Sequence, residues 1–407
     1  MPYYTKRLRA CIFSALRNAP CTFEEIVRGC AGAYPTVVKR VLDSLNVHNS
    51  LVPLYTTQDS VVPYSSDAPV DYQGFNLVTY KISNNPVLSN WYFSWHTCKK
   101  IGQLDNWHGK KILFLGTPRL FEYFVIENKA QSFTLIDYDK LVIDELGAKY
   151  GGNDNICILR QDINFLENFT PQYDYVFFDP PWNYSSYVWW LTIATRFVTP
   201  TGKLVFPLFP YMVRPTASKE REQLFQICRK LSKNMFTIPE FVEYDIPSFE
   251  RNELVNEGVY LRANWKVADF VILQGIDCHL EDLQGVKLNT EYLSWREFSW
   301  CGIRWFIKNA EREGNNITDE NTPLISLIDD SLFLKSPSSR EPKLKLVNVL
   351  SSEGHGFYTS NTQKFIDIMN ALESNTLIHD TEIKWEHYTI DDKSKKIIES
   401  LRGLHYG

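Results

Sequence analysis

The segment Asp179-Pro180-Pro181-Trp182 holds the residues of this 407-residue chain whose types and spacing are best suited to chemistry. It follows a short apolar run, residues 175–178, of the kind that forms a buried parallel strand. The two prolines lack the backbone N–H that a strand needs, so the strand is expected to end here. An acid and an aromatic ring are therefore fixed at the carboxyl end of a strand, where open α/β sheets bind their ligands.

Two more residues suit a nucleotide-like ligand at the same sheet edge. Gly116 ends one apolar run, and Asp137 ends the next, 21 residues later. A glycine lets the backbone approach such a ligand, and a carboxylate at the second strand end accepts hydrogen bonds from ribose hydroxyls. The loop after Gly116 has one glycine where the dinucleotide motif has three, and Pro118 removes a further N–H group. These features count against a dinucleotide.

The surrounding pattern predicts the sheet that positions these residues. Apolar runs alternate with helical patterns, which predicts right-handed βαβ crossovers and a Rossmann-like, doubly wound α/β sheet of seven strands. The predicted strands are 111–116, 133–137, 156–159, 175–178, 204–208, 241–244 and 269–273. The helices between them include 119–127, 141–150, 188–198 and 218–231. Asp162 lies just beyond the third strand, so each of the first four strands leads into a candidate ligand-binding residue.

The order of these strand-end residues resembles the class I S-adenosylmethionine-dependent methyltransferases, over about residues 85–275. The Asp-Pro-Pro-Trp segment is similar to the motif of their amino-methyltransferase branch. The resemblance implies S-adenosyl-L-methionine as cofactor, with Gly116 at its methionine part, Asp137 at the ribose and Asp162 at the adenine amine. Upstream, Tyr92-Phe93-Ser94-Trp95 resembles a segment that touches the cofactor carboxylate, with Trp95 in place of the expected proline. The cofactor-binding residues expected on this basis are Phe93, Ser94, Leu115, Gly116, Thr117, Asp137, Tyr138, Asp162, Ile163 and Asp179.

The resemblance assigns catalysis to Asp179, Pro180, Pro181 and Trp182, and the chemistry fits an amino group. The lone pair of an aromatic or amide-like NH₂ is delocalised, so the nitrogen must become more nucleophilic before it accepts a methyl group. The Asp179 carboxylate and the Pro180 carbonyl can accept its two hydrogens while Trp182 stacks on its plane. A base in a duplex would first have to be flipped out. The alternative is that Asp-Pro-Pro only ends a strand.

The pattern changes after about Gly275, so the chain is divided into three predicted domains. Residues 1–80 are expected to form a winged-helix-like domain and a linker, 81–275 the methyltransferase domain, and 276–407 a C-terminal α+β extension. Aromatic and polar residues alternate over 292–308, as in half-buried strands, and two amphipathic helices close the chain. The extension is a candidate site for a protein partner.

The beginning of the chain resembles a winged helix-turn-helix domain. Helical patterns begin near Lys6, after Thr22, where Glu25 completes a capping box, and at Pro35. Residues 51–54 would form the wing strand. In such domains the third helix reads the major groove of DNA, although many serve in packing or dimerisation instead.

Charge indicates nucleic acid as a candidate partner of two stretches. The chain as a whole has a net charge of −5, but its first 50 residues hold seven Lys/Arg and three Asp/Glu, a net charge of +4. Residues 5–50 are therefore a candidate surface for DNA or RNA. The basic stretch 214–233 is a second candidate for phosphate contacts, and a solvated helix face is the alternative there.

Composition excludes several other classes of protein. No apolar run approaches the roughly 20 residues that span a bilayer, and the N-terminus lacks the apolar region of a secretory signal. The eight cysteines form no C-x-x-C pair and have no histidine at metal-ligand spacing. A cytoplasmic protein with reduced cysteines, no metal and no membrane contact is therefore expected.

The leading hypothesis is an S-adenosylmethionine-dependent N-methyltransferase that acts on an amino group, most simply the exocyclic amine of adenine in DNA or RNA. The alternatives are methylation of a protein amine or amide, aminopropyl transfer to a polyamine, and a non-catalytic scaffold for nucleic acid or protein. Branched-chain polyamine synthases resemble this arrangement, but they carry an acid-rich loop after the first strand, where this chain has Thr117-Pro118-Arg119. The single glycine at Gly116 favours the scaffold.

Overall fold

The computed structural model of the chain describes residues 2–17, 21–45, 85–88, 90–166, 172–261, 264–276, 294–300, 302–308, 323–328, 346–375 and 390–403. These residues form two compact units. The first unit lies within Met1–Ile82, Trp91–Ile246 and Val259–Leu288. The second lies within Ser83–Asn90, Pro247–Gly258 and Asn289–Gly407. Each unit is described by itself below.

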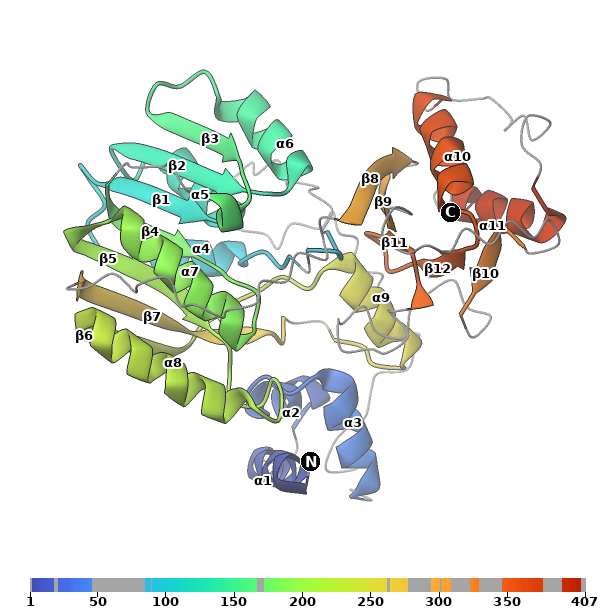
Figure 1. The fold of residues 1–407 in the computed structure, drawn as a ribbon. Coiled ribbons are helices and arrows are strands. Elements are labelled where there is room, and N and C mark those ends of the chain that lie inside the picture. Colours follow the sequence, from blue (N-terminus) through green and yellow to red (C-terminus); the bar gives the residue numbers. More distant parts are fainter. Residues whose placement is uncertain are drawn as a thin grey trace. The chain divides into compact units, whose positions relative to one another are not determined.

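A seven-stranded sheet forms the centre of the first unit (Figure 1). Its strands are β1 (Lys111–Leu115), β2 (Ser132–Asp137), β3 (Ile156–Arg160), β4 (Tyr173–Phe178), β5 (Val198–Leu208), β6 (Ser232–Glu243) and β7 (Val267–Ile276). They lie in the order β3-β2-β1-β4-β5-β7-β6. The strands β1 to β5 pair in parallel, whereas β7 is antiparallel to both β5 and β6. The predicted seven-stranded, Rossmann-like sheet is confirmed. Its strand order runs outward from β1 to β3 on one side and from β4 onward on the other, so the switch in strand order lies between β1 and β4.

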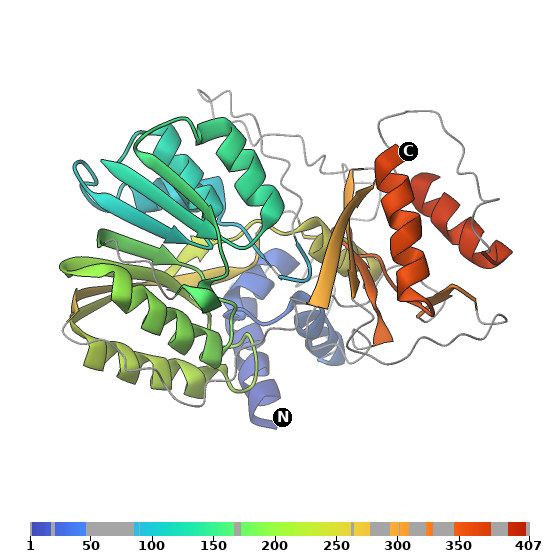
Figure 2. The same ribbon diagram turned by 45° about the horizontal axis from the view of Figure 1, so that its top comes forward.

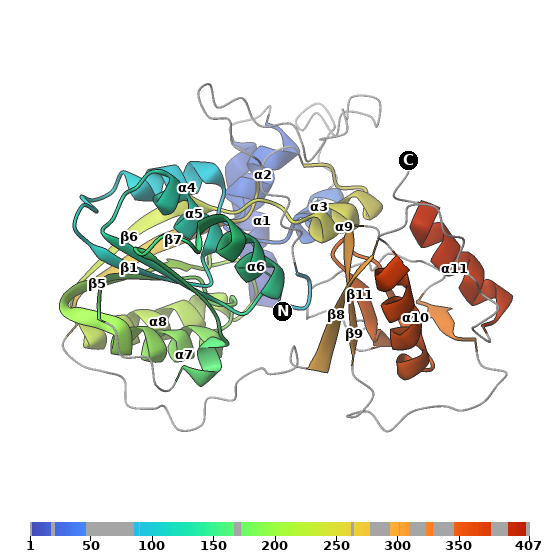
Figure 3. The same cartoon turned by 90° about the horizontal axis from the view of Figure 1, so that it is seen from above.

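Helices cover both faces of this sheet, as Figure 3 shows. They are α4 (Trp95–Gly102), α5 (Pro118–Ile126), α6 (Lys140–Tyr150), α7 (Tyr184–Phe197) and α8 (Ala217–Leu231). Alternate side chains of β1 enter two separate cores: Leu113 and Leu115 pack with α7 and α8, while Ile112 and Phe114 pack with α4 to α6. A strand buried on both faces needs the continuous apolar run that the sequence shows.

Three predicted elements begin at the wrong residue. Strand β5 begins at Val198 instead of residue 204. Helix α7 begins at Tyr184 instead of residue 188, because the Asn183 side chain accepts a hydrogen bond from the Ser186 N–H (2.9 Å) and caps the helix there. Strand β6 begins at Ser232 instead of residue 241. Its pairing with β7 shifts register between Ile238 and Val242, which interrupts the alternating pattern that would have identified a longer strand.

The N-terminal helices α1 (Pro2–Leu16), α2 (Phe23–Gly29) and α3 (Pro35–Ser44) belong to the first unit. The predicted Thr22–Glu25 capping box is present. The helices pack on the loop after β5, where the Tyr4 hydroxyl donates to the Met212 carbonyl (2.8 Å) and the Met212 N–H donates to the Ala31 carbonyl (2.9 Å). The predicted wing strand lies outside the described residues, so the winged-helix domain stays a prediction.

Among its described residues, the second unit has an antiparallel sheet (Figure 2) and three helices. Its sheet has the order β10-β12-β11-β9-β8, from β8 (Trp295–Trp300), β9 (Ile303–Lys308), β10 (Ile325–Leu327), β11 (Val349–Ser351) and β12 (Gly356–Thr359). The helices are α9 (Ser248–Asn256), α10 (Thr362–Asn375) and α11 (Asp392–Gly403). Apolar residues of α10 and α11 share one core with the sheet, as expected for an α+β extension. In the described part of the chain, no helix has the length and apolar character needed to cross a membrane.

Candidate active site

The carboxyl ends of β1, β2 and β4 bring three of the predicted residues together. Leu115 pairs with Ile136 on one side and with Phe178 on the other. The next residue, Gly116, donates its N–H to the Ile136 carbonyl (3.0 Å), and Asp179 donates its N–H to the Leu115 carbonyl (3.4 Å). Gly116 therefore lies between Asp179 on one neighbouring strand and the end of β2 on the other.

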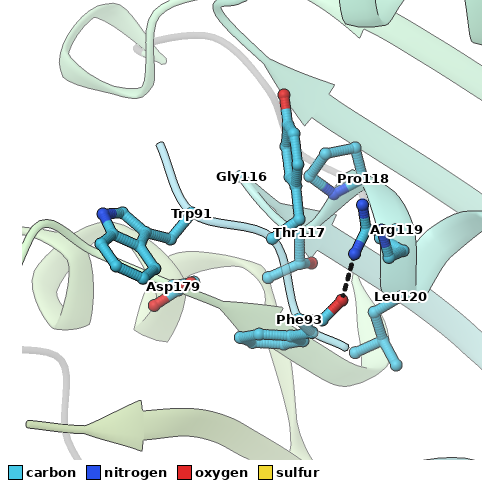
Figure 4. A pocket seen from close by; sticks show the side chains of 9 residues that line it. Trp91, Phe93, Gly116, Thr117, Pro118, Arg119, Leu120 and Asp179 are labelled. Carbon is cyan, nitrogen blue, oxygen red and sulfur yellow. Dashed lines mark hydrogen bonds between the residues drawn. The ribbon is translucent and has the colours of Figure 1, made fainter. Parts of the chain in front are cut away.

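A small pocket opens at this edge (Figure 4). It is lined by Trp91, Tyr92, Phe93, Gly116, Thr117, Pro118, Arg119, Leu120 and Asp179. Its cavity volume is about 10 Å³, room for about one water molecule. A larger ligand that enters the pocket must therefore displace side chains around it, and the half-buried Trp91 is the most exposed aromatic ring among them.

The loop between β1 and α5 has the features of a ligand cradle. Gly116 has φ +61°, and a Cβ atom at this position would lie 2.9 Å from Trp190 Cη2. The buried Thr117 Oγ1 has no hydrogen-bond partner among the residues that the structure describes. A buried hydroxyl without a partner is costly, so its placement at a pocket wall fits a polar ligand group. Helix α5 begins at the next residue, Pro118, and directs its positive end to the same place.

Arg119 joins this loop to the segment that precedes α4. Its guanidinium donates to the Phe93 carbonyl (3.0 Å) and forms an ion pair with Asp245 (Figure 4 shows the first of these contacts). It also lies 5.3 Å from the centroid of the Tyr92 ring. These contacts hold the segment against the pocket and bring a positive charge to its wall.

The predicted ribose and adenine positions lie along the same edge, beyond Gly116. The Asp137 Oδ1 accepts the Asp139 N–H (2.9 Å), and the Gln161 N–H donates to the Asp137 carbonyl (3.0 Å). Asp162 is buried. Burial raises the pKa of the Tyr138 hydroxyl, and the nearby Asp162 carboxylate raises it further. Tyr138 and Asp162 are therefore close enough to interact, and their role in cofactor binding stays a prediction.

Asp179 has an unusual environment for a carboxylate. Its side chain keeps some exposed surface, but the dense surroundings of the carboxyl group raise its pKa to about 7. Two contacts oppose this rise: the Tyr244 hydroxyl donates to Asp179 Oδ1 (2.9 Å), and the positive charge of Lys266 is close by. Near neutral pH the group can therefore both accept and release a proton.

Three aromatic rings next to Asp179 form a cage around Lys266. The Lys266 Nζ lies 3.8 Å from the centroid of the Trp91 ring, 4.4 Å from that of Trp182 and 5.2 Å from that of Tyr244. The Trp182 and Tyr244 rings meet edge to face, with centroids 5.6 Å apart. We refer to Trp91, Trp182 and Tyr244 as the aromatic cage.

Arg214 holds the backbone of Trp182, one of the three residues of the aromatic cage. Its guanidinium donates to the Trp182 carbonyl and forms an ion pair with Glu220. Arg221, in the same predicted basic stretch, is buried and paired with Asp269. These two arginines therefore serve internal contacts.

Sequence reasoning missed Tyr244 and Lys266 as site residues. Tyr244 was expected only as the end of a strand, and Lys266 precedes β7 without any motif around it. Ser94, predicted to bind the cofactor, is placed as the N-cap of α4, where its Oγ accepts the Thr97 N–H (3.1 Å). Phe93 does line the pocket. Among the described residues, no group of three or more His, Cys, Asp or Glu side chains is arranged to hold a metal ion.

Residues 84–247 match the family model described as "Probable N6-adenine methyltransferase". The matched segment contains strands β1 to β6 and every residue that lines the pocket. The match covers less than half of the chain, and over this segment it supports a methyltransferase. No curated protein sequence matches this chain.

Several solved structures resemble this chain in fold. A mutein of the branched-chain polyamine synthase from Thermus thermophilus has a TM-score of 0.50 at 14% identity, over 68% of this chain and 89% of its own. The synthase itself gives 0.48 at 14% identity, over 69% and 92%. An rRNA methylase from Streptococcus thermophilus gives 0.30 at 8% identity, over 44% and 95%. At such low identity only the fold is shared.

The residues at the pocket fit S-adenosylmethionine in type and place. Gly116 allows close approach, and the Thr117 hydroxyl and the Arg119 charge suit the polar methionine part. The Asp137 and Asp162 carboxylates lie farther along the edge, where the ribose and the adenine would follow.

Proposed function

We propose that this methyltransferase transfers a methyl group to the exocyclic amine of adenine in DNA or RNA. The observation that carries the proposal is the position of Asp179-Pro180-Pro181-Trp182 at the end of β4, beside Gly116 and within the matched segment. The description of the matched family names the same amine.

The side chains of this site supply positioning and electrostatics. The bound cofactor supplies an electrophilic methyl group on a sulfonium. Asp179 accepts a hydrogen of the target NH₂, which returns electron density to the nitrogen, and Tyr244 holds the carboxylate in place. The Trp182 ring offers a face on which a flipped base can stack. Because Pro180 and Pro181 fix the turn and Pro181 accepts the Asn183 N–H (2.6 Å), these groups are in place before the substrate arrives.

Positive charge for a nucleic acid is available mainly on the N-terminal helices. Lys6, Arg9 and Arg17 of this module are exposed, as required for phosphate contacts. In the stretch 214–233, Arg214 and Arg221 are engaged inside the protein. Only the other cations of this stretch can therefore contact the phosphate backbone of a nucleic acid.

A protein lysine is the second candidate acceptor. The observation that favours it is the Lys266 ammonium between the Trp91 and Trp182 rings, because a site that holds one alkyl ammonium can hold another. Aminopropyl transfer to a polyamine has less support, since the loop Thr117-Pro118-Arg119 at the pocket holds no acidic residue to bind a polycation.

Labelled S-adenosylmethionine and separate pools of DNA, RNA and protein test the proposal directly. We expect label in a nucleic-acid pool, at adenine N6, and a loss of roughly 100-fold or more for Asp179→Ala, the size typical of removing a group that stabilises a transition state. Calorimetry should show nearly unchanged cofactor binding in this variant. The matched control is Asp174→Ala, which removes the carboxylate at the opposite end of β4, where it accepts the Lys111 N–H (2.9 Å). Full transfer by Asp179→Ala, or label in the protein pool alone, contradicts the adenine assignment.

A further inference from the structure

Lys266 is held by aromatic rings next to Asp179, the acid that is expected to act on an acceptor amine. Its Nζ lies on the faces of Trp91 and Trp182, at 3.8 and 4.4 Å from the ring centroids, with Tyr244 as the third side of the cage. Cations are attracted to aromatic faces within about 6 Å, most strongly to tryptophan. The cage therefore holds the ammonium in one place.

The same ammonium lies beside the acid that is expected to act on the acceptor. The charge of Lys266 lowers the pKa of Asp179, and Tyr244 contacts both groups, through its hydroxyl and through its ring. Asp179 and Trp91 also line the pocket at Gly116, where the methionine part of the cofactor is expected. Trp91 is thus a wall of both the cage and the pocket, and Tyr244 joins the cage to the acid.

The backbone around Lys266 is fixed on both sides. Its carbonyl accepts the Tyr244 N–H (3.0 Å), and β7 begins at the next residue. The preceding Trp265 is buried and packs edge to face on Trp91 (5.9 Å between centroids). The backbone is therefore fixed, and the amine is presented to the cage as part of the fold.

We propose that Lys266 is a methyl acceptor of its own chain. This inference rests on the proposed function, because it uses the same donor and the same acid. Nζ first loses a proton to the Asp179 carboxylate. Its lone pair then forms a bond to the methyl carbon of S-adenosylmethionine, the carbon–sulfur bond breaks, and its electron pair stays on sulfur in S-adenosylhomocysteine. The product, a methylated lysine, is still a cation and keeps its affinity for the cage.

The position of the amine can be tested without any cofactor. Reductive methylation with ¹³C-formaldehyde converts accessible lysines to dimethyl-lysines with resolved NMR signals. Methyl groups on Lys266 lie over two indole rings, so we expect one signal upfield of the rest, absent in Lys266→Arg and moved in Trp91→Ala. If no signal depends on Lys266, or if its signal has an ordinary shift, the ammonium is outside the cage and the inference is wrong.

Methyl transfer is tested by incubating the purified full chain with S-adenosylmethionine and no other acceptor. Peptide mass spectrometry should find one to three added methyl groups on Lys266, at a first-order rate that does not change with protein concentration. Asp179→Ala should lose the modification. Lys100→Arg is the matched control, because Lys100 also lies on a ring, Phe241 (4.4 Å), and not on the aromatic cage beside Asp179, so this variant should be modified like the parent.

The outcomes distinguish a failure of this inference from a failure of the proposed function. Labelled nucleic acid together with an unmodified Lys266 overturns self-methylation and leaves the methyltransferase function intact. Methyl groups on other lysines but not on Lys266 also overturn it. If calorimetry finds no cofactor binding and no pool is labelled, it is the proposed function that fails.

Discussion

Replacing Tyr244 with phenylalanine removes the hydroxyl that donates to Asp179 Oδ1 and leaves the ring of the aromatic cage in place. The hydrogen bond stabilises the charged carboxylate and so lowers its pKa, against the rise caused by burial. In Tyr244→Phe the pKa of Asp179 must therefore rise above its parent value of about 7. The pH at which methyl transfer reaches half of its maximal rate should rise with this pKa, because the reaction needs the carboxylate.

The expected size of the effect follows from the strength of this bond. A hydrogen bond to a charged group contributes about 1.5–3 kcal/mol, and about 1.4 kcal/mol corresponds to one pKa unit, so the shift is about one to two units. At pH 7 the ionised fraction then falls from about a half to between about 1 and 10%. Methyl transfer at pH 7 should drop by roughly 5- to 50-fold and recover toward the parent rate at about pH 9 to 10.

The measurement is kcat/KM for labelled-methyl transfer between about pH 5.5 and 10, a range that brackets the expected titration of Asp179 in both proteins. Tyr187→Phe is the matched control: it also removes a buried tyrosine hydroxyl, one that donates to the Pro207 carbonyl (2.7 Å) and not to Asp179. The control should keep the parent pH at half-maximal rate. A Tyr244→Phe profile that is lower by one constant factor at every pH would refute the reasoning, because it would show that the hydroxyl acts through packing alone.

Three further changes test other parts of the site. Gly116→Ala forces a side chain into a left-handed conformation and toward Trp190, so urea denaturation should show a loss of about 1–2 kcal/mol in stability. Arg214→Ala leaves the Trp182 carbonyl without its donor, so methyl transfer should fall by roughly 10- to 100-fold while calorimetric cofactor binding stays constant. The folded pKa of Asp179 is about 7 and the unfolded one about 3.9, so its ionisation destabilises the fold as pH rises between these values. Asp179→Asn should therefore raise the melting temperature by several degrees at pH 8 and hardly at all at pH 4.

The sequence predicts those parts of the site that depend on short stretches of chain. Gly116, Asp137 and Asp179 each follow a buried apolar run, and parallel strands bring such ends to one edge of a sheet. Because β1 and β4 are neighbours in the observed order, Gly116 and Asp179 line one pocket. Their functional roles remain predictions, which the variants above test.

The aromatic cage could not be predicted in this way. Trp91 precedes α4, Trp182 follows β4, and Lys266 comes immediately before β7, so they meet only after the sheet has formed. No spacing rule connects segments that distant. The antiparallel pairing of β6 with β7 brings Tyr244 beside Lys266, and the irregular register of that pairing hid the true length of β6.

Residues of the N-terminal helices contact the sequence neighbours of Tyr244 and Lys266. Arg28, in the last turn of α2, pairs with Glu243 (2.9 Å) and donates to the Asn264 carbonyl (2.8 Å), each close in sequence to Tyr244 or Lys266. Tyr34, at the start of α3, packs edge to face on Trp265 (5.5 Å between centroids). The exposed Arg28–Glu243 ion pair adds little stability by itself. Its position is what matters: it ties α2 to the residue next to Tyr244, whose hydrogen bond lowers the pKa of Asp179 against the effect of burial.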